Sequence, residues 1–372
     1  GCNENLVLAS PQVIMRIHEN FLRAGADIIE TNTFGASAIV LAEYSLAGKA
    51  QEINATAARI ARDAVSKHNS SGEPRFVAGS IGPTTKTISV TGGVTFSEMR
   101  TSYREQAEAL LFGGVDMLLL ETTQDTINLK AALLGIDEAF HSHGGRVPVA
   151  ISVTIETMGT MLAGQGVEAL YSAVAHHDLL ALGLNCATGP DFMTDHLRTL
   201  AACSRFRTLC VPNAGLPDED GKYNESPEMI AKKLERFVEA GWINIIGGCC
   251  GTTPRHIELL SAMLEGKTPR KPEAVRQSVV SGLEALVIDE DKRPVLVGER
   301  TNVIGSRKFK RLIASGKFEE GAELGRKQVR GGAQIVDVCL ADPDREEMED
   351  MTAFLDVLVK KIKVPLMVDS TD

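Results

Sequence analysis

The chain has 372 residues, of which 44% are hydrophobic and 24% are charged, and its net charge is −10. This acidic balance argues against general nucleic-acid binding, which needs a basic surface, and no apolar run is long enough to span a membrane. Seven cysteines in a large chain without a signal peptide favour reduced thiols over a disulfide framework, so we expect a cytoplasmic enzyme with neither a nucleic-acid nor a membrane partner.

Predicted helices and short strands alternate over the first 265 residues. The first helix begins at Ser10-Pro11, where serine is a favoured cap and proline a favoured first residue. This alternation predicts βαβ units in a parallel sheet. Strands are expected at 27–32, 76–81, 116–121, 148–153, 179–185, 208–212 and 243–246, and further helices at 51–67, 96–112, 126–140, 191–203 and 227–240.

The strand count favours an incomplete barrel. A (β/α)8 TIM barrel has eight strands, whereas seven are predicted before residue 250 and the chain opens on a helix without an initial Met. We therefore expect a fragment that lacks the first barrel strand. An open doubly wound sheet also fits seven strands. The barrel is preferred because polar or glycine-rich motifs follow almost every strand, on the side where barrel enzymes build their sites.

A second unit follows a predicted linker. The segment 266–272 holds two prolines and three cations, which is typical of an exposed connection, and we place the linker at 266–292. Beyond it, strands are expected at 295–297, 333–338 and 365–369, and helices at 318–330 and 345–360. Residues 293–372 are too few for a closed barrel, so we expect the first three strands of a second, incomplete (β/α)8 barrel.

Three cysteines lie at predicted strand ends. Cys186 ends the sixth barrel strand, and Cys249 and Cys250 follow the eighth. Neighbouring residues in a strand face opposite sides, so both thiols reach one metal only if the backbone turns, which glycines at 247, 248 and 251 permit. Three thiolates suit a zinc ion with an open fourth position. The alternatives are a strained disulfide between the adjacent pair, or core burial, which we expect for Cys203, Cys210 and Cys339.

The open position indicates thiol chemistry. A thiol that binds zinc loses its proton and becomes a nucleophile at neutral pH. The His-Glu-x-x-His pattern of zinc hydrolases is absent from the sequence. The rival hypothesis is a structural zinc module with four protein ligands and no exchangeable position.

Two motifs resemble those of a known family. Gly-Leu-Asn-Cys at 183–186 and Gly-Gly-Cys-Cys-Gly-Thr-Thr-Pro at 247–254 resemble the zinc motifs of the homocysteine-binding, zinc-dependent methyltransferases. Matches at 30–34, 82–84 and 212–215 extend the resemblance over most of residues 1–265, the homocysteine-binding zinc barrel. The segment 297–302 resembles the start of the pterin-binding domain of cobalamin-dependent methionine synthases.

The resemblance implies roles for individual residues. Glu121 would receive the amino group of homocysteine. Asn302 and Asp369 would face the pterin ring, and Asp suits this role because it accepts paired hydrogen bonds. The implied zinc ligands are Cys186, Cys249 and Cys250, with Asn213 as a fourth ligand when substrate is absent.

The implied reaction is S-methyl transfer to homocysteine, which yields methionine. The donor would be methylcobalamin recharged from 5-methyltetrahydrofolate, and the expected partner is a cobalamin-binding module outside these residues. A thiol methyltransferase with another donor is the alternative. The sequence departs from the family in the missing first strand and in Asp337-Val338-Cys339, where many relatives have Asp-x-Asn. The basic run 307–311 is interpreted as a solvated helix face, or as a site that attracts the glutamate tail of folate or an acidic module.

Overall fold

The computed structural model describes residues 1–68, 73–273 and 277–370. The chain divides into two compact units, Gly1–Val167 with Val174–Val275 and Glu168–Ala173 with Arg276–Asp372. Each unit contains its own parallel sheet. Within these described ranges, no helix combines the length and the apolar character that crossing a bilayer requires.

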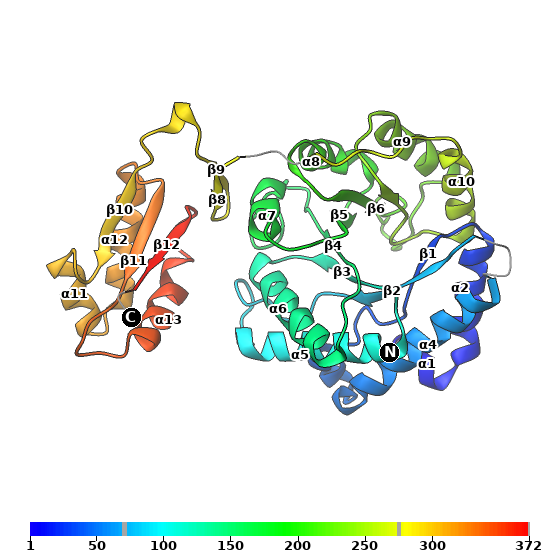
Figure 1. Cartoon of the computed structure of the whole chain (residues 1–372), viewed down its shortest axis with the longest axis horizontal. Coiled ribbons are helices and arrows are strands. Elements are labelled where there is room, and N and C mark those ends of the chain that lie inside the picture. The colour runs from blue at the N-terminus through cyan, green and yellow to red at the C-terminus, as the bar shows by residue number, and fades with distance from the viewer. Residues whose placement is uncertain (69–72, 274–276, 371–372) are drawn as a thin grey trace. The chain divides into compact units, whose positions relative to one another are not determined.

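The first unit is built on a curled parallel sheet of seven strands with helices on its outside (Figure 1). Each strand pairs with its neighbour in sequence, whereas a doubly wound sheet reverses its order at a switch point. The order is therefore that of a TIM-like barrel, as predicted, with β1 and β7 as the edge strands. The strands are β1 (Ile28–Glu30), β2 (Phe76–Ile81), β3 (Met117–Thr123), β4 (Val149–Val153), β5 (Ala181–Cys186), β6 (Arg207–Pro212) and β7 (Ile245–Ile246).

Several helices of this unit begin at a residue whose side chain caps them. Thr95 forms a capping box with Glu98, and the Ser226 hydroxyl accepts the Met229 N–H, whereas Ser10 makes no side-chain capping bond. The four-residue helices α1 and α3, with α7, lay outside the prediction. The helices are α1 (Leu6–Ala9), α2 (Pro11–Arg23), α3 (Ala38–Leu41), α4 (Ala50–His68), α5 (Phe96–Gly113), α6 (Thr126–His143), α8 (Pro190–Cys203), α9 (Pro227–Glu239) and α10 (Pro254–Leu264), with 3-10 turns η1 (Ala42–Tyr44) and η2 (Ala47–Lys49). Between β4 and β5 the chain forms α7 (Val167–Val174), of which Glu168–Ala173 group with the second unit.

The inner face of the sheet changes from apolar to polar along the strands. Its buried cluster includes Ala78, Leu119 and Ala150. Two residues further along the same strands, and so on the same face, stand Ser80, Glu121 and Ser152. The polar layer therefore lies at the carboxyl ends of the strands, which is where barrel enzymes place their sites.

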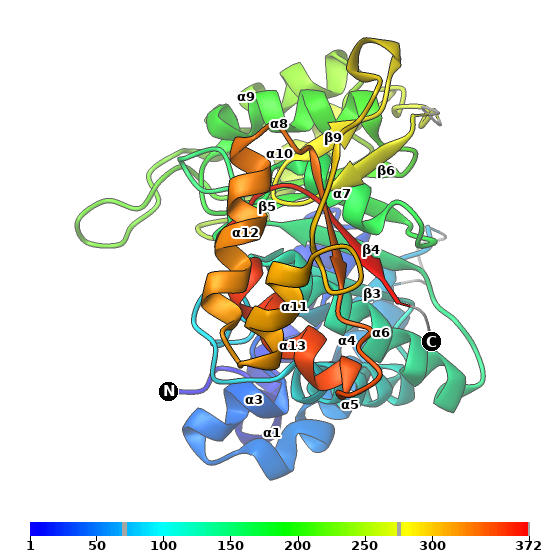
Figure 2. The ribbon, with the colours of Figure 1, turned by 90° about the vertical axis from the view of Figure 1, so that its left-hand side faces the viewer.

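The second unit contains a three-stranded parallel sheet in the order β10 (Val297–Asn302), β11 (Ile335–Cys339), β12 (Leu366–Asp369). Figure 2 looks onto α11 (Arg307–Ala314), α12 (Phe318–Arg330) and α13 (Glu347–Leu358). Phe309 of α11 and Phe354 of α13 belong to one buried cluster with Val338 of β11.

Two local predictions for this unit differ from the structure. The first strand was predicted at 295–297 but occupies Val297–Asn302. The prediction ended too early because Glu299 to Asn302 are polar and show no alternation of apolar residues. The predicted linker 266–292, of which 274–276 lie outside the described residues, contains the antiparallel hairpin β8 (Val279–Ser281) and β9 (Ala285–Val287), followed by η4 (Glu290–Lys292).

Candidate metal centre

Three cysteine thiols meet at the carboxyl ends of the strands of the first unit. Cys186 is the last residue of β5, and Cys249 and Cys250 follow β7. The Cys250 sulfur lies 3.9 Å from that of Cys186 and 3.9 Å from that of Cys249, and all three ligand atoms fall within 4.8 Å of one another. The predicted cluster is therefore present as a geometric arrangement.

The sulfur spacing fits a zinc ion. Zinc binds thiolates tetrahedrally at about 2.3 Å, which places the sulfurs of two ligands about 3.8 Å apart. Thiolates are soft donors that select zinc over magnesium or calcium. Elsewhere in the described chain, Cys210 and Cys339 are buried as expected, and Cys203 is half-buried on α8.

A tight turn brings the adjacent thiols to one side. The Thr252 N–H donates to the Cys249 carbonyl at 3.1 Å, and Gly251 adopts a φ of +80°, a left-handed conformation that glycine allows at little cost. A Cβ on Gly248 would lie 2.1 Å from the Thr252 hydroxyl oxygen. Glycines 248 and 251 are thus required as predicted, whereas a Cβ on Gly247 would meet nothing closer than 3.7 Å.

A second turn directs Cys186. Its φ is +58°, that of Ala187 is +45°, and the Thr188 N–H closes back onto the Cys186 carbonyl at 2.6 Å. Left-handed conformations in residues other than glycine cost about 1–3 kcal/mol each and gather at functional sites. The strand therefore bends sharply at its ligand residue.

Asn185 connects the thiols to the polar layer of the barrel. Its Oδ1 accepts the Thr122 N–H at 2.9 Å and the Ser152 hydroxyl at 2.7 Å. Its Nδ2 donates to Thr122 Oγ1 at 2.8 Å and lies 3.9 Å from the Cys249 sulfur. The prediction gave this residue no role, although it stands beside Cys186 in the quoted motif.

Asn213 approaches the cluster from the end of β6. Its Oδ1 accepts the Cys250 N–H at 3.1 Å, and the next residue, Ala214, donates its N–H to the Cys250 carbonyl at 2.9 Å. The Cys250 backbone is thereby held on both sides. The Asn213 side chain is engaged in fixing a ligand residue, and its role as a fourth ligand stays a prediction.

The thiols shift one another's pKa values in opposite directions. Hydrogen bonding with Cys186 and Cys249 lowers the pKa of Cys250, whereas hydrogen bonding with Cys186 and Cys250 raises the pKa of Cys249. Several negative sulfurs at this spacing need a cation to offset their repulsion. A bound dication would provide it, since metal ligands bind in their deprotonated form.

Glu121 is a buried carboxyl group in the polar layer. Burial raises its pKa well above the ordinary carboxyl range, and the nearby Glu30 and Cys250 raise it further. The Ser80 hydroxyl donates to its Oε1. Glu30 was not predicted as a site residue, although it begins the quoted segment 30–34. Glu30 is exposed at the end of β1 whereas Glu121 is buried, and a bound cation would offset the repulsion between the two carboxylates.

The predicted pterin residues share one face of the second sheet. Asn302 pairs in register with Cys339, which pairs with Asp369. The Asn302 Nδ2 donates to Asp337 Oδ2 at 3.0 Å, and its Oδ1 accepts the N–H groups of Ile304 and Gly305. In the basic run, Lys310 forms an ion pair with Asp342 at 3.1 Å.

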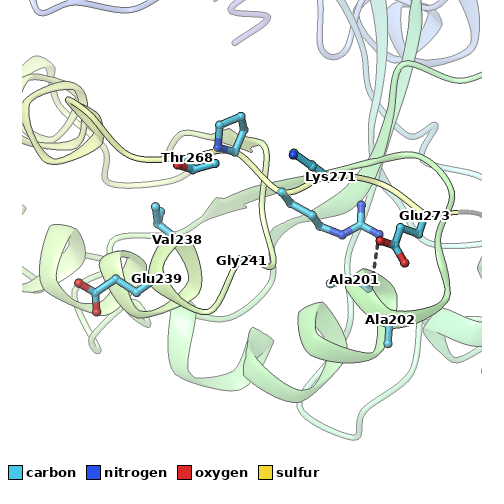
Figure 3. Close-up of a pocket in the computed structure, with 10 residues that line it drawn as sticks. Ala201, Ala202, Val238, Glu239, Gly241, Thr268, Lys271 and Glu273 are labelled. Carbon is cyan, nitrogen blue, oxygen red and sulfur yellow. Dashed lines mark hydrogen bonds between the residues drawn. The ribbon is translucent and has the colours of Figure 1, made fainter.

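A separate cavity of about 610 Å³ lies near the carboxyl-terminal ends of α8 and α9 (Figure 3). Ala201 and Glu239 line one side, and Thr268, Lys271 and Glu273 line the other. These helix ends precede β6 and β7, so the cavity lies at the opposite end of the strands from the thiols.

Comparisons with known proteins give two matching families. Residues 1–264 match the model of homocysteine S-methyltransferases, and residues 298–372 match that of pterin binding enzymes. Three crystal structures of the homocysteine methyltransferase MmuM from Escherichia coli resemble the chain at 23% identity. The metallated and oxidised forms have TM-scores of 0.58 and 0.57, covering 69% of this chain and 86% of that one. For the apo form the TM-score is 0.55, with coverage of 71% and 90%. At this identity, the structural likeness shows the fold alone.

Proposed function

Because the chain belongs to the homocysteine S-methyltransferase family, as the match over residues 1–264 shows, we propose that it methylates the sulfur of homocysteine at a zinc ion held by three thiolates. The observation that carries this proposal is the set of sulfur distances around Cys250, 3.9 Å to Cys186 and 3.9 Å to Cys249. The existence of a metallated form of the homocysteine methyltransferase MmuM supports a metal in this fold.

The ligand residues would hold the metal and leave one position for substrate. When bound, zinc supplies a Lewis acid that lets a thiol lose its proton at neutral pH. The turn at Cys249 and Cys250 aims both sulfurs at one point, and Asn185 fixes Cys249 relative to the polar layer. Three protein ligands are the usual number at a catalytic zinc site.

Glu121 would bind the ammonium group of the amino-acid substrate. Its carboxyl group is buried, faces the barrel interior beside Ser80, and feels the charge of Cys250. An ammonium group would offset the repulsion between Glu121 and Glu30 and so favour the ionised carboxylates. The site would thus recognise a molecule with a thiol at one end and an ammonium group at the other.

The second unit would bind the folate that supplies the methyl group. We propose that Asn302 and Asp369 face the pterin of 5-methyltetrahydrofolate, which the family match over residues 298–372 supports. Methyl transfer would then pass through cobalamin on a separate module. In this proposal, residues 1–265 form the zinc barrel, 266–292 the connection and 293–372 the first part of a pterin barrel, in a cytoplasmic methionine synthase.

Cys249→Ser tests the metal proposal directly. The variant should lose most of its bound zinc, measured by elemental analysis, and its affinity for homocysteine. Cys203→Ser, at the end of α8 and outside the cluster, is the matched control and should keep both. Unchanged zinc and homocysteine binding in Cys249→Ser would refute the proposal.

Proton release distinguishes catalytic zinc from a structural zinc module. A thiol that binds an open zinc position must release its proton, so homocysteine should acidify a weakly buffered solution of the zinc-loaded protein. A site closed by four protein ligands gives no such release. Methylcobalamin and small methyl donors can then be compared as substrates to distinguish the proposed donor from the alternative.

A further inference from the structure

The carboxyl group of Glu121 has one hydrogen-bond partner in the described part of the chain. Ser80 stands on the neighbouring strand β2 and donates its hydroxyl proton to Glu121 Oε1. Both residues are buried, with exposed fractions of 2% for Ser80 and 8% for Glu121. The other carboxyl oxygen, Oε2, makes no such bond to a described residue, so it is left for a ligand.

The backbone of Ser80 is held by two buried threonines, Thr31 and Thr33. Both follow the edge strand β1, whose pairing with β2 ends at Ala78, two residues before Ser80. The Ser80 N–H donates to Thr31 Oγ1 at 3.0 Å, and the Ser80 carbonyl accepts the Thr33 hydroxyl at 2.6 Å. The two threonine side chains therefore replace the strand pairing at this position and fix Ser80 on both sides.

The direction of each hydrogen bond in this group follows from its partners. A carbonyl oxygen only accepts, so the single hydroxyl proton of Thr33 goes to the Ser80 carbonyl. The two threonine hydroxyls lie 2.6 Å apart, so Thr31 must be the donor of that pair, while its oxygen still accepts the Ser80 N–H. Both threonine protons are thus engaged. The Ser80 hydroxyl remains as the donor to Glu121, and it projects from a fixed backbone.

We propose that Ser80 is a positioning residue for the substrate, because its hydroxyl holds the Glu121 carboxylate in one orientation and leaves Oε2 to accept the ammonium group of the amino acid. This inference rests on the proposed role of Glu121 and deepens it. A flexible side chain that must be immobilised on binding lowers affinity, whereas one that is already ordered does not. Ser80, with Thr31 and Thr33 behind it, supplies this order before the substrate arrives.

The proposed role makes the effect of Ser80 depend on the ammonium group of the ligand. Without the Ser80 hydroxyl, an ammonium group would have to order the Glu121 carboxylate as it binds, and this ordering costs affinity. A thiol ligand without an ammonium group does not use Glu121. Its affinity should therefore be independent of Ser80, which a general structural defect at this position would not produce.

The test titrates the zinc-loaded full chain with homocysteine and with 4-mercaptobutanoic acid, which is homocysteine without its amino group. Ser80→Ala removes the hydroxyl and keeps the backbone groups that Thr31 and Thr33 bind. Ser102→Ala is the matched control, because Ser102 on α5 is 4% exposed and its hydroxyl has no hydrogen-bond partner among the described residues. Calorimetry gives both dissociation constants. Their ratio measures the preference for an ammonium group and does not depend on the fraction of folded protein.

Ser80→Ala should bind homocysteine about tenfold more weakly and 4-mercaptobutanoic acid with unchanged affinity, whereas Ser102→Ala should match the wild type for both. A wild-type ratio in Ser80→Ala would overturn the role of Ser80 and leave that of Glu121 standing. If the wild type shows no preference between the two ligands, the role of Glu121 fails, and that of Ser80 fails with it. If the wild type binds neither thiol, the proposed function itself fails.

Discussion

At the scale of single residues, Glu121 is a carboxyl group that the fold keeps away from water. Its raised pKa, caused first by burial and then by Glu30, means that the folded, ligand-free protein binds this proton more tightly than the unfolded chain does. The resulting contribution to stability is complete below the carboxyl pKa of the unfolded chain, about 4.3, and is lost as the pH rises through the higher folded value.

Glu121→Gln should therefore raise the thermal stability of the metal-free, ligand-free protein at neutral pH, because glutamine does not ionise. The difference from the wild type should vanish below about pH 4, where both states of the wild type are protonated. Melting temperatures between pH 4 and 8 check this, with the exposed Glu105→Gln as control. The same variant should bind homocysteine more weakly, so equal melting curves at pH 7 or undiminished affinity would contradict the assignment.

The three clustered cysteines were predictable because cysteines at strand ends beside glycines have few structural roles: metal binding, a disulfide or burial in the core. The role of Asn185 was not. Its side chain contacts Thr122, which is 63 residues away in sequence. Side-chain contacts of this kind follow from tertiary structure, which the spacing of residue types does not encode.

At the scale of elements, the turn after β7 depends on a glycine for two separate reasons. Gly251 has a left-handed φ of +80°, and its missing side chain makes room for Tyr223. Gly221 has a similar φ of +75° but meets nothing within 4 Å, so a substitution there has only the backbone cost. Substitutions at Gly251 and Gly221 therefore distinguish the cost of the left-handed backbone from the effect of the contact with Tyr223.

Gly251→Ala should lose at least tenfold in zinc affinity, because Tyr223 and the ligand turn must move apart. Gly221→Ala should keep wild-type zinc affinity, although both variants carry the left-handed cost of about 1–2 kcal/mol. Chelator competition on both proteins provides the comparison. Equal zinc affinities in the two variants would mean that the contact with Tyr223 has no influence on the metal site.

Arg270 attaches the segment after α10 to the end of α8. Arg270 donates from its guanidinium to the carbonyls of Ala201, Ser204 and Phe206 at 2.7–2.8 Å, around the end of α8. The last carbonyls of a helix lack partners within it, and a cation is favoured there. This residue was predicted to lie in an exposed linker, since local composition does not reveal that a distant helix end is available to bind it.

Arg270→Ala should reduce the free energy of unfolding of the first unit by about 1.5–3 kcal/mol, the range for hydrogen bonds to a charged group. Lys271→Ala, the next cation along, should change it by less than about 0.5 kcal/mol. Urea unfolding followed by the fluorescence of Trp242, the single tryptophan, reports on this unit. A loss in Lys271→Ala as large as that in Arg270→Ala would contradict the anchoring role.

At the scale of the whole molecule, a metal at the cluster should affect only part of the chain. Its ligands lie at the carboxyl ends of β5 and β7, and β6 lies between these strands in the sheet. A ligand that binds only the folded state stabilises it by about 4 kcal/mol at a thousand times its Kd. Hydrogen exchange with and without a chelator should show metal-dependent protection in β5, β6 and β7 and none in β10, β11 and β12. Protection spread evenly over both units would contradict this assignment.

The architecture of the first unit was predictable because alternating helices and strands leave few arrangements, and the sequential strand order is that of a barrel. Short elements such as α1 and α3 escaped prediction because four residues show no helical period. For the second unit, the sequence and the structure agree on three parallel strands, and closure into a second barrel stays a prediction.

The separation of Cys186 and Cys250 along the chain gives the cluster one more consequence. The two residues are 64 positions apart, so a metal that joins their sulfurs would close a ring through coordinate bonds, and this ring contains α8, β6, α9 and β7. In the chain-entropy treatment of cross-links, a ring of this size restricts the unfolded chain by about 4 kcal/mol. A metal that stays bound during unfolding would therefore act as a reversible cross-link. Its loss would increase the conformational entropy of residues 186–250 in the unfolded chain.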